Sequence, residues 1–140
     1  MTGSLLDISG NDIAELGDGD LRNLIARLCE AEMRRRDYPT SAVTAGGQQE
    51  AKDGGVDVRV ALPASTVISG YVPRPATGFQ VKKSDMPPKA IAKEMRPKGK
   101  VRPILRELAA EDGAYIIVSS KWIRRVTAPF GCVERRWPMP

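Results

Sequence analysis

The chain has 140 residues, of which 41% are hydrophobic and 28% charged, a composition that predicts one soluble domain with a core. It contains no histidine, which excludes Ser-His-Asp and Cys-His catalysis and leaves oxygen atoms as the expected ligands of any bound metal. The net charge of +5 is uneven: residues 1–57 hold 6 Lys or Arg against 11 Asp or Glu, and residues 74–106 hold 10 against 2, which suggests a cation site beside a polyanion-binding surface.

Two helices are predicted in the first part of the chain. Ser9 precedes Asp12 by three residues, the spacing of a capped helix start, and a short helical turn follows. Glycines interrupt this turn, and Asp20 can cap a second helix that runs to about Arg36. The apolar stripe of this second helix consists of Leu21, Leu24, Ile25 and Leu28.

Strands are predicted where β-branched and alternating residues stand between prolines and glycines. They cover residues 56–62, 66–72, 79–83 and 114–120, with a further short strand at 41–44. Residues 73–78 form the predicted turn into the strand 79–83, and helices are predicted over 89–95 and 103–110. The order is helix, three strands, helices and strand, which predicts a single α/β domain over residues 1–120.

Residues 121–140 show neither helical nor alternating periodicity and collect Trp, Pro and Arg without a pattern. We expect an irregular basic tail here, either an unstructured extension or the product of a truncated or frame-shifted reading frame. Without a closing helix, the last predicted strand would have an exposed edge. No apolar run approaches the roughly 18 residues that cross a bilayer, and no secretory signal is recognisable, so a cytoplasmic protein without a membrane segment is expected.

Three acidic or polar features suggest a site. Asp57 follows two glycines at the start of a strand, and Gln80 and Lys82 project from one face of a later strand. Glu32 lies four residues beyond Leu28 on the apolar stripe of its helix, where a carboxylate is costly unless it has a partner. Each feature alone is also what an ordinary turn, half-exposed strand or helix would show.

Together these residues can bind a divalent cation. Oxygen ligands would come from Glu32, Asp57, the Gln80 side chain and the Val81 carbonyl, a set suited to Mg²⁺ or Mn²⁺. Lys82 beside them would orient a water molecule or stabilise the charge that builds on a phosphate. Hydrolysis of a phosphodiester needs these parts, since charge on the attacking and leaving oxygens must be neutralised.

Gly55-Val56-Asp57 followed by Gln80-Val81-Lys82, in an α-β-β-β-α-β order, resembles the PD-(D/E)xK nuclease superfamily and is most similar to its Mrr-like restriction branch. The resemblance covers residues 20–120 and implies a restriction-endonuclease-like core, in which helices flank a central mixed sheet. It implies that Asp57 is a metal ligand, that Gln80 and Lys82 form the second half of the motif, and that a glutamate of the first helix is an auxiliary ligand. In Mrr-like proteins this glutamate often lies early in the helix, where this chain has Arg22, so Glu30 and Glu50 remain alternatives to Glu32.

The resemblance implies a magnesium- or manganese-dependent endonuclease that cuts DNA as a restriction or defence effector, joined to a recognition module that these residues do not encode. A homodimer is a further expectation, and RNA remains an alternative substrate. Gln80 is neutral where most members have Glu, so we expect weaker metal binding. A catalytically degenerate fold, serving as a nucleic-acid-binding or protein-interaction module, is the alternative. The expected phosphate contacts, or else plain solubilising charges, are Lys83, Lys89, Lys93, Lys98 and Lys100.

Overall fold

The computed structural model describes residues 9–45, 56–82, 87–119, 122–127 and 131–136 of the chain. The helices are α1 (Gly10–Glu15), α2 (Asp18–Arg35), α3 (Pro88–Met95) and α4 (Pro103–Ala110), with 3₁₀ turns at Thr40–Ala42 and Pro97–Gly99. The strands are β1 (Val43–Ala45), β2 (Val58–Ala61), β3 (Ala76–Lys82), β4 (Ala114–Ser119), β5 (Trp122–Thr127) and β6 (Gly131–Arg136).

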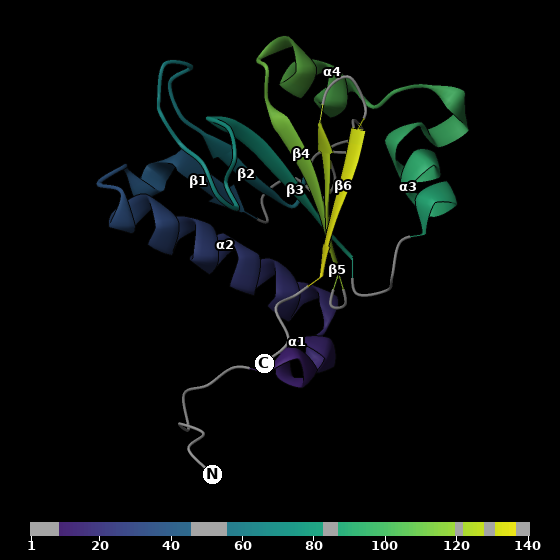
Figure 1. Ribbon diagram of the computed structural model, residues 1–140, viewed down its shortest axis with the longest axis horizontal. Helices are drawn as coiled ribbons and strands as arrows, with labels where there is room; N and C mark the ends of the chain where they lie inside the picture. The colour runs from purple at the N-terminus through teal and green to yellow at the C-terminus, as the bar shows by residue number, and fades with distance from the viewer. Residues whose placement is uncertain (1–8, 46–55, 83–86, 120–121, 128–130, 137–140) are drawn as a thin grey trace.

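All six strands belong to one mixed sheet in the order β1-β2-β3-β4-β5-β6. Only β3 and β4 pair in parallel, and the other neighbours are antiparallel. The parallel pair requires a crossover, which α3 and α4 supply. In Figure 1, α2 crosses one face of the sheet, while α3 and α4 lie on the other side. The predicted α/β class is therefore confirmed.

The face of the sheet toward α2 is apolar. The side chains that α2 buries there include Leu21, Ile25, Cys29 and Met33. They pack with alternate residues of the strands, namely Val58, Val60, Phe79, Val81, Ile116 and Val118. Period-two alternation then directs the intervening residues of each strand to the opposite face.

A second apolar cluster covers the face toward α3 and α4. From the helices it takes Ile91, Met95, Ile104, Leu105 and Leu108. From the sheet it takes Ala76, Tyr115 and Ile117. Gly78 lies between Ala76 and Gln80 on the same face, and a Cβ there would meet Val56 and Leu108 at 2.8 and 3.1 Å. Gln80 and Lys82 therefore continue this face beyond its apolar part.

Most predicted helices are confirmed. Ser9 and Asp12 form the expected capping box, with Ser9 N–H donating to Asp12 Oδ2 at 2.7 Å. The helix predicted over residues 103–110 has those same bounds. The second helix begins at Asp18 rather than after Asp20, because Gly17 takes the extended conformation of an N-cap.

The strand predicted over residues 66–72 is wrong, since these residues form no strand. Val67 is 83% exposed, and side chains of other elements hold this segment by its carbonyl groups. Tyr38 Oη donates to Val67 O at 2.7 Å, and Arg36 Nη2 donates to Ser69 O at 2.9 Å. The short strand β1 is the third of the three expected strands, in place of residues 66–72. The order of helix, three strands, helices and strand therefore holds. The predicted turn 73–78 ends earlier, because β3 begins at Ala76.

The irregular tail predicted for residues 121–140 is wrong over the residues that form β5 and β6. These strands pair with each other over Trp122–Thr127 and Gly131–Arg136, and β5 also pairs with β4. The backbone of β4 therefore has neighbours on both sides, and the expected exposed edge is covered. Within the described ranges, no helix is both long enough and apolar enough to cross a membrane.

The connection from α4 to β4 positions the centre of the sheet. Asp112 has a φ of 52°, its N–H donates to Ala109 O, and Gly113 N–H donates to Leu108 O at 2.7 Å. These two bonds form a Schellman motif, which satisfies the last carbonyls of α4. A Cβ on Gly113 would meet the backbone oxygens of Ala76 and Leu108 at 2.6 and 2.9 Å, so β4 approaches α4 and β3 more closely than any other residue allows.

We expect Gly113→Ala to lower the free energy of unfolding by about 2–3 kcal/mol, because neither backbone oxygen can move without disturbing β3 or α4. Urea unfolding measures this change. Gly19→Ala is the matched control, since a Cβ there meets nothing within 4 Å and lies in helix α2, so it should be neutral or stabilise by up to about 1 kcal/mol. Equal effects of the two substitutions would contradict this view of the α4–β4 connection.

Candidate active site

Asp57 lies at the end of the pairing between β2 and β3. Its N–H donates to Phe79 O at 2.9 Å, and its Oδ2 accepts from Val81 N–H at 2.8 Å. Val58 and Phe79 are the last paired residues of β2 and β3, so no backbone carbonyl of β2 lies opposite Val81. The Asp57 carboxylate takes the place of this missing backbone acceptor. Because Val81 N is bonded to the carbonyl carbon of Gln80, the carboxylate lies against the Gln80–Val81 peptide.

The Val81 carbonyl points toward the same edge as its N–H, because both groups of one residue in an antiparallel pair face the same neighbouring strand. This edge is where β2 has ended and the Asp57 carboxylate stands. Gln80 and Lys82 are half-buried and leave β3 toward α3 and α4. One end of β3 thus carries the Asp57 carboxylate, the Val81 carbonyl and the Gln80 and Lys82 side chains.

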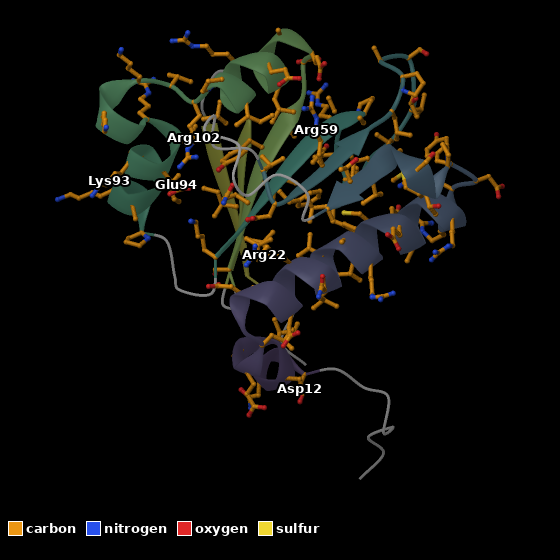
Figure 2. The ribbon with its side chains drawn as sticks, turned by 180° about the vertical axis from the view of Figure 1, so that it is seen from behind. Asp12, Arg22, Arg59, Lys93, Glu94 and Arg102 are labelled. Carbon is orange, nitrogen blue, oxygen red and sulfur yellow. The ribbon has the colours of Figure 1, made fainter. Side chains whose placement is uncertain are left out.

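A positive and a negative side chain from two helices face these groups. Arg22 of α2 places Nη1 3.8 Å from Asp57 Oδ1, and Glu94 of α3 places Oε1 3.6 Å from Lys82 Nζ. Both separations are too long for hydrogen bonds but close enough for strong charge interaction, since the side chains of Asp57 and Glu94 are only 12% and 19% exposed. Figure 2 labels Arg22 on α2 and Glu94 on α3.

Glu94 is held in place by Arg102, which precedes α4. Arg102 Nη2 donates to Glu94 Oε1 at 2.9 Å, and its Nε donates to the Glu94 carbonyl at 2.5 Å (Figure 2). Glu94 is not among the site residues predicted from the sequence. The spacing of apolar residues could have indicated it, because Glu94 stands three residues after Ile91 and next to Met95. Glu94 therefore belongs to the apolar stripe of α3 that is buried.

The hydroxyl of Tyr115 is buried beside these charges. Tyr115 is 4% exposed, and in the described part of the chain its hydroxyl has no hydrogen-bond partner. Burial raises the pKa of Tyr115, the negative charge of Glu94 raises it further, Arg102 opposes the rise, and Asp57 adds to it. The hydroxyl therefore stays protonated and can donate a hydrogen bond, and the charges of Glu94, Arg102 and Asp57 all act on it.

The structure does not bring Glu32 to this site. Glu32 Oε1 accepts from Arg35 Nη2 and from Arg36 Nε, both at 2.6 Å, so two arginines of its own helix balance its charge. It stands ten residues after Arg22 on α2, a rise of about 15 Å along the helix. The prediction that Glu32 shares a cation with Asp57 is therefore wrong. Of the two alternatives, Glu30 pairs with Arg34 at 3.9 Å and Glu50 lies outside the described residues.

The predicted phosphate contacts follow the segment from α3 to α4. Their described members are exposed: Lys89, Lys93, Lys98 and Lys100. Lys83 lies outside the described residues. Lys93 points away from the sheet in Figure 2, and Lys98 and Gly99 turn the chain with φ values of 57° and 77°. This segment therefore presents positive charge on the same side of the sheet as Lys82.

The donors at the end of β3 are all oxygens. In the ranges that the structure describes, no three His, Cys, Asp or Glu side chains are grouped as a metal site. The acceptors at this end are the Asp57 carboxylate, the Gln80 amide oxygen and the Val81 carbonyl, and within the described ranges the buried Tyr115 hydroxyl has no hydrogen-bond partner. Such donors fit a hard cation that keeps several water molecules, as Mg²⁺ does.

The arginine pairing of Glu32 generates a pH-dependent prediction. Hydrogen bonds from Arg35 and Arg36 lower the pKa of Glu32 to about 2 from 4.5, so its stabilising effect is complete above pH 4.5 and is lost as the pH falls toward 2. Glu32→Gln should lower the free energy of unfolding at pH 7 by about 1–3 kcal/mol, and this loss should shrink between pH 4.5 and pH 2.

Urea unfolding at a series of pH values measures this difference. Glu30→Gln on the same helix is the control, since Glu30 is 36% exposed and pairs only at 3.9 Å, and it should change stability by less than about 0.5 kcal/mol. A Glu32→Gln effect that is independent of pH would contradict the assigned cause.

Comparisons with known proteins identify no relative of this chain. No protein-family model, no curated protein and no solved structure matches the chain.

Proposed function

We propose that this chain is a metal-dependent endonuclease that hydrolyses phosphodiester bonds in DNA and has a restriction-endonuclease-like core. The observation that carries the proposal is the hydrogen bond from Val81 N–H to Asp57 Oδ2, at 2.8 Å. This bond joins the two halves of the motif, which are 24 residues apart in the sequence, at one end of two adjacent strands. A chance combination of a turn aspartate and an alternating strand would not require this contact.

The topology supports the same proposal. Helix α2 precedes three antiparallel strands, α3 and α4 cross over, and β4 returns parallel to β3. This is the α-β-β-β-α-β order that the family resemblance implies. Strands β5 and β6 extend the sheet beyond β4, on the side away from β2. They therefore do not alter the pairing of β2 with β3, where Asp57 lies.

Asp57 Oδ1, the Gln80 amide oxygen and the Val81 carbonyl would hold the cation. Oδ2 of Asp57 is engaged by Val81 N–H, which fixes the carboxylate and leaves Oδ1 toward the site. A bound Mg²⁺ or Mn²⁺ supplies Lewis-acid stabilisation of phosphate charge and a more acidic water.

Lys82 has the second chemical role. Its side chain is 36% exposed, and its ammonium group can donate hydrogen bonds both to an attacking water and to a phosphate oxygen. Glu94 of α3 lies 3.6 Å from this group, and its negative charge attracts the ammonium and limits the positions that it takes. The lysine therefore orients the nucleophile and stabilises the negative charge that grows on the phosphate.

The exposed lysines of the α3–α4 segment would contact the DNA backbone. Lys89, Lys93, Lys98 and Lys100 are spread over this segment without an acid between them except Glu94, which Arg102 and Lys82 neutralise. Such contacts bind phosphate without reading the base sequence. A recognition module, a homodimer and a role in defence against foreign DNA in the cytoplasm belong to this proposal.

One observation favours a second function. Arg22 stands 3.8 Å from Asp57 Oδ1, where a cation-binding site would be expected to have a carboxylate or water. A guanidinium in this position can bind a phosphate directly. The second candidate is therefore a nucleic-acid-binding module that keeps the fold but does not cut.

Asp57→Asn and Lys82→Met should each reduce nicking of supercoiled plasmid by more than about 100-fold in Mg²⁺ or Mn²⁺. Asn still offers Val81 N–H an oxygen acceptor, so the variant removes the charge and keeps the hydrogen bond. EDTA should stop nicking by the unchanged protein, and gel electrophoresis measures the rate. Asp112→Asn is the matched control, because Asp112 is 85% exposed and its ion pair, among the residues that the structure describes, is with Arg74. Undiminished nicking in both site variants would refute the assignment.

Arg22→Gln separates the two functions. In an endonuclease, loss of the guanidinium frees Asp57 Oδ1, so nicking should reach its half-maximal rate at a lower Mn²⁺ concentration. In a binding module, the same substitution removes one phosphate contact, so DNA affinity should fall and the slope of log affinity against log salt should decrease by about 1. Nicking assays and fluorescence anisotropy on one protein preparation measure both quantities.

A further inference from the structure

The network Lys82–Glu94–Arg102 brings a carboxylate to the end of β3 from the crossover helix. Arg102 binds both the side-chain oxygen and the main-chain carbonyl of Glu94, which fixes the position of the residue at the end of α3. In the described part of the chain, both ion pairs of this carboxylate are made by Oε1. The Glu94 carboxylate therefore lies beside the Lys82 ammonium group at the end of β3, and Arg102 holds it there.

The charges at this end of the sheet indicate what a second carboxylate would do there. β3 contributes Gln80, a neutral amide, beside Lys82, a cation, and β2 contributes the single carboxylate of Asp57. One carboxylate with neutral oxygens binds a divalent cation weakly, whereas two bind it considerably more tightly. Glu94 is the acid that pairs with Lys82, at 3.6 Å, and Glu32, the acid expected from the helix α2, pairs with its own arginines.

Tyr115 is a second buried polar group that the charges of Glu94 and Asp57 affect. Its hydroxyl has no partner among the described residues although Tyr115 is 96% buried, and the acids whose charges reach it are Glu94 and Asp57. A buried donor without an acceptor costs about 1–3 kcal/mol, which is recovered if a water molecule of a bound ion accepts its hydrogen bond. Tyr115 leaves β4 on the same face of the sheet as Gln80 and Lys82.

We infer that Glu94 is the second carboxylate ligand of the divalent cation bound at Asp57, supplied by α3 in place of the acid that β3 lacks at Gln80. The inference rests on the proposed metal-dependent function. Arg102 is a positioning residue in this arrangement, because its hydrogen bond to Oε1 fixes the Glu94 carboxylate near the end of β3. Lys82 lies between the ligands and the phosphate to be cut.

Mn²⁺ binding to the full chain, measured by isothermal titration calorimetry without DNA, tests the inference. Glu94→Gln should weaken Mn²⁺ binding about tenfold or more, and adding Gln80→Glu to this variant should restore most of the affinity by returning a carboxylate from β3. Glu107→Gln is the matched control, because Glu107 is 52% exposed and pairs with Arg59 of β2, and it should leave Mn²⁺ affinity unchanged. Glu94→Asp keeps the charge but withdraws it by one methylene, and should weaken binding about threefold or more.

The outcomes separate this inference from the function on which it rests. Unchanged Mn²⁺ affinity in both Glu94→Gln and Glu94→Asp would overturn the role of Glu94 while leaving the Asp57 site in place. Absence of Mn²⁺ binding by the unchanged protein at millimolar concentration would overturn both. If urea unfolding shows that Glu94→Gln is not folded, the Glu94→Asp result decides, because that variant retains the ion pair with Arg102.

Discussion

The arrangement of this protein depends on the point where β2 ends and β3 continues. From this point on, β3 has backbone donors that β2 cannot satisfy, and the side chain of Asp57 accepts the first of them from Val81. The bond satisfies a partly buried N–H group, and it also fixes a carboxylate beside the Gln80–Val81 peptide. Structure and candidate chemistry therefore share one residue, and loss of Asp57 would affect both.

The parallel pairing of β3 with β4 explains why other groups gather at the same end. A parallel pair needs a crossover, so the chain leaves β3 at Lys82, builds α3 and α4 over one face, and returns at Ala114. The crossover carries Glu94 and Arg102 back to the strand that it has just left. Helix α2 begins at this end on the other face and brings Arg22 to Asp57 (Figure 1).

Much of the fold was predictable, because local signals and final structure agree. Pro103 at a helix start and a run of apolar residues after Gly113 were sufficient for α4 and β4. The segment 66–72 has the residues of a strand, but hydrogen bonds from Arg36 and Tyr38 hold its carbonyls. β5 and β6 lack a strand pattern and are formed by pairing with the edge of β4, which no local window contains.

The positions of the candidate site residues were predictable where they depend on the register of the strands. They were not predictable where they depend on how the helices pack. Asp57 reaches the Gln80–Val81 peptide because β2 and β3 pair in antiparallel fashion with Val58 opposite Phe79. Glu32 was assigned to the site because a buried acid needs a partner, but Arg35 and Arg36, at three and four residues beyond it, already provided one. The same requirement applies to Glu94, whose partners Lys82 and Arg102 are distant in sequence. A buried acid with cations one helical turn away is thus explained by its own helix, whereas one whose cations come from other elements marks a place where the fold gathers charge.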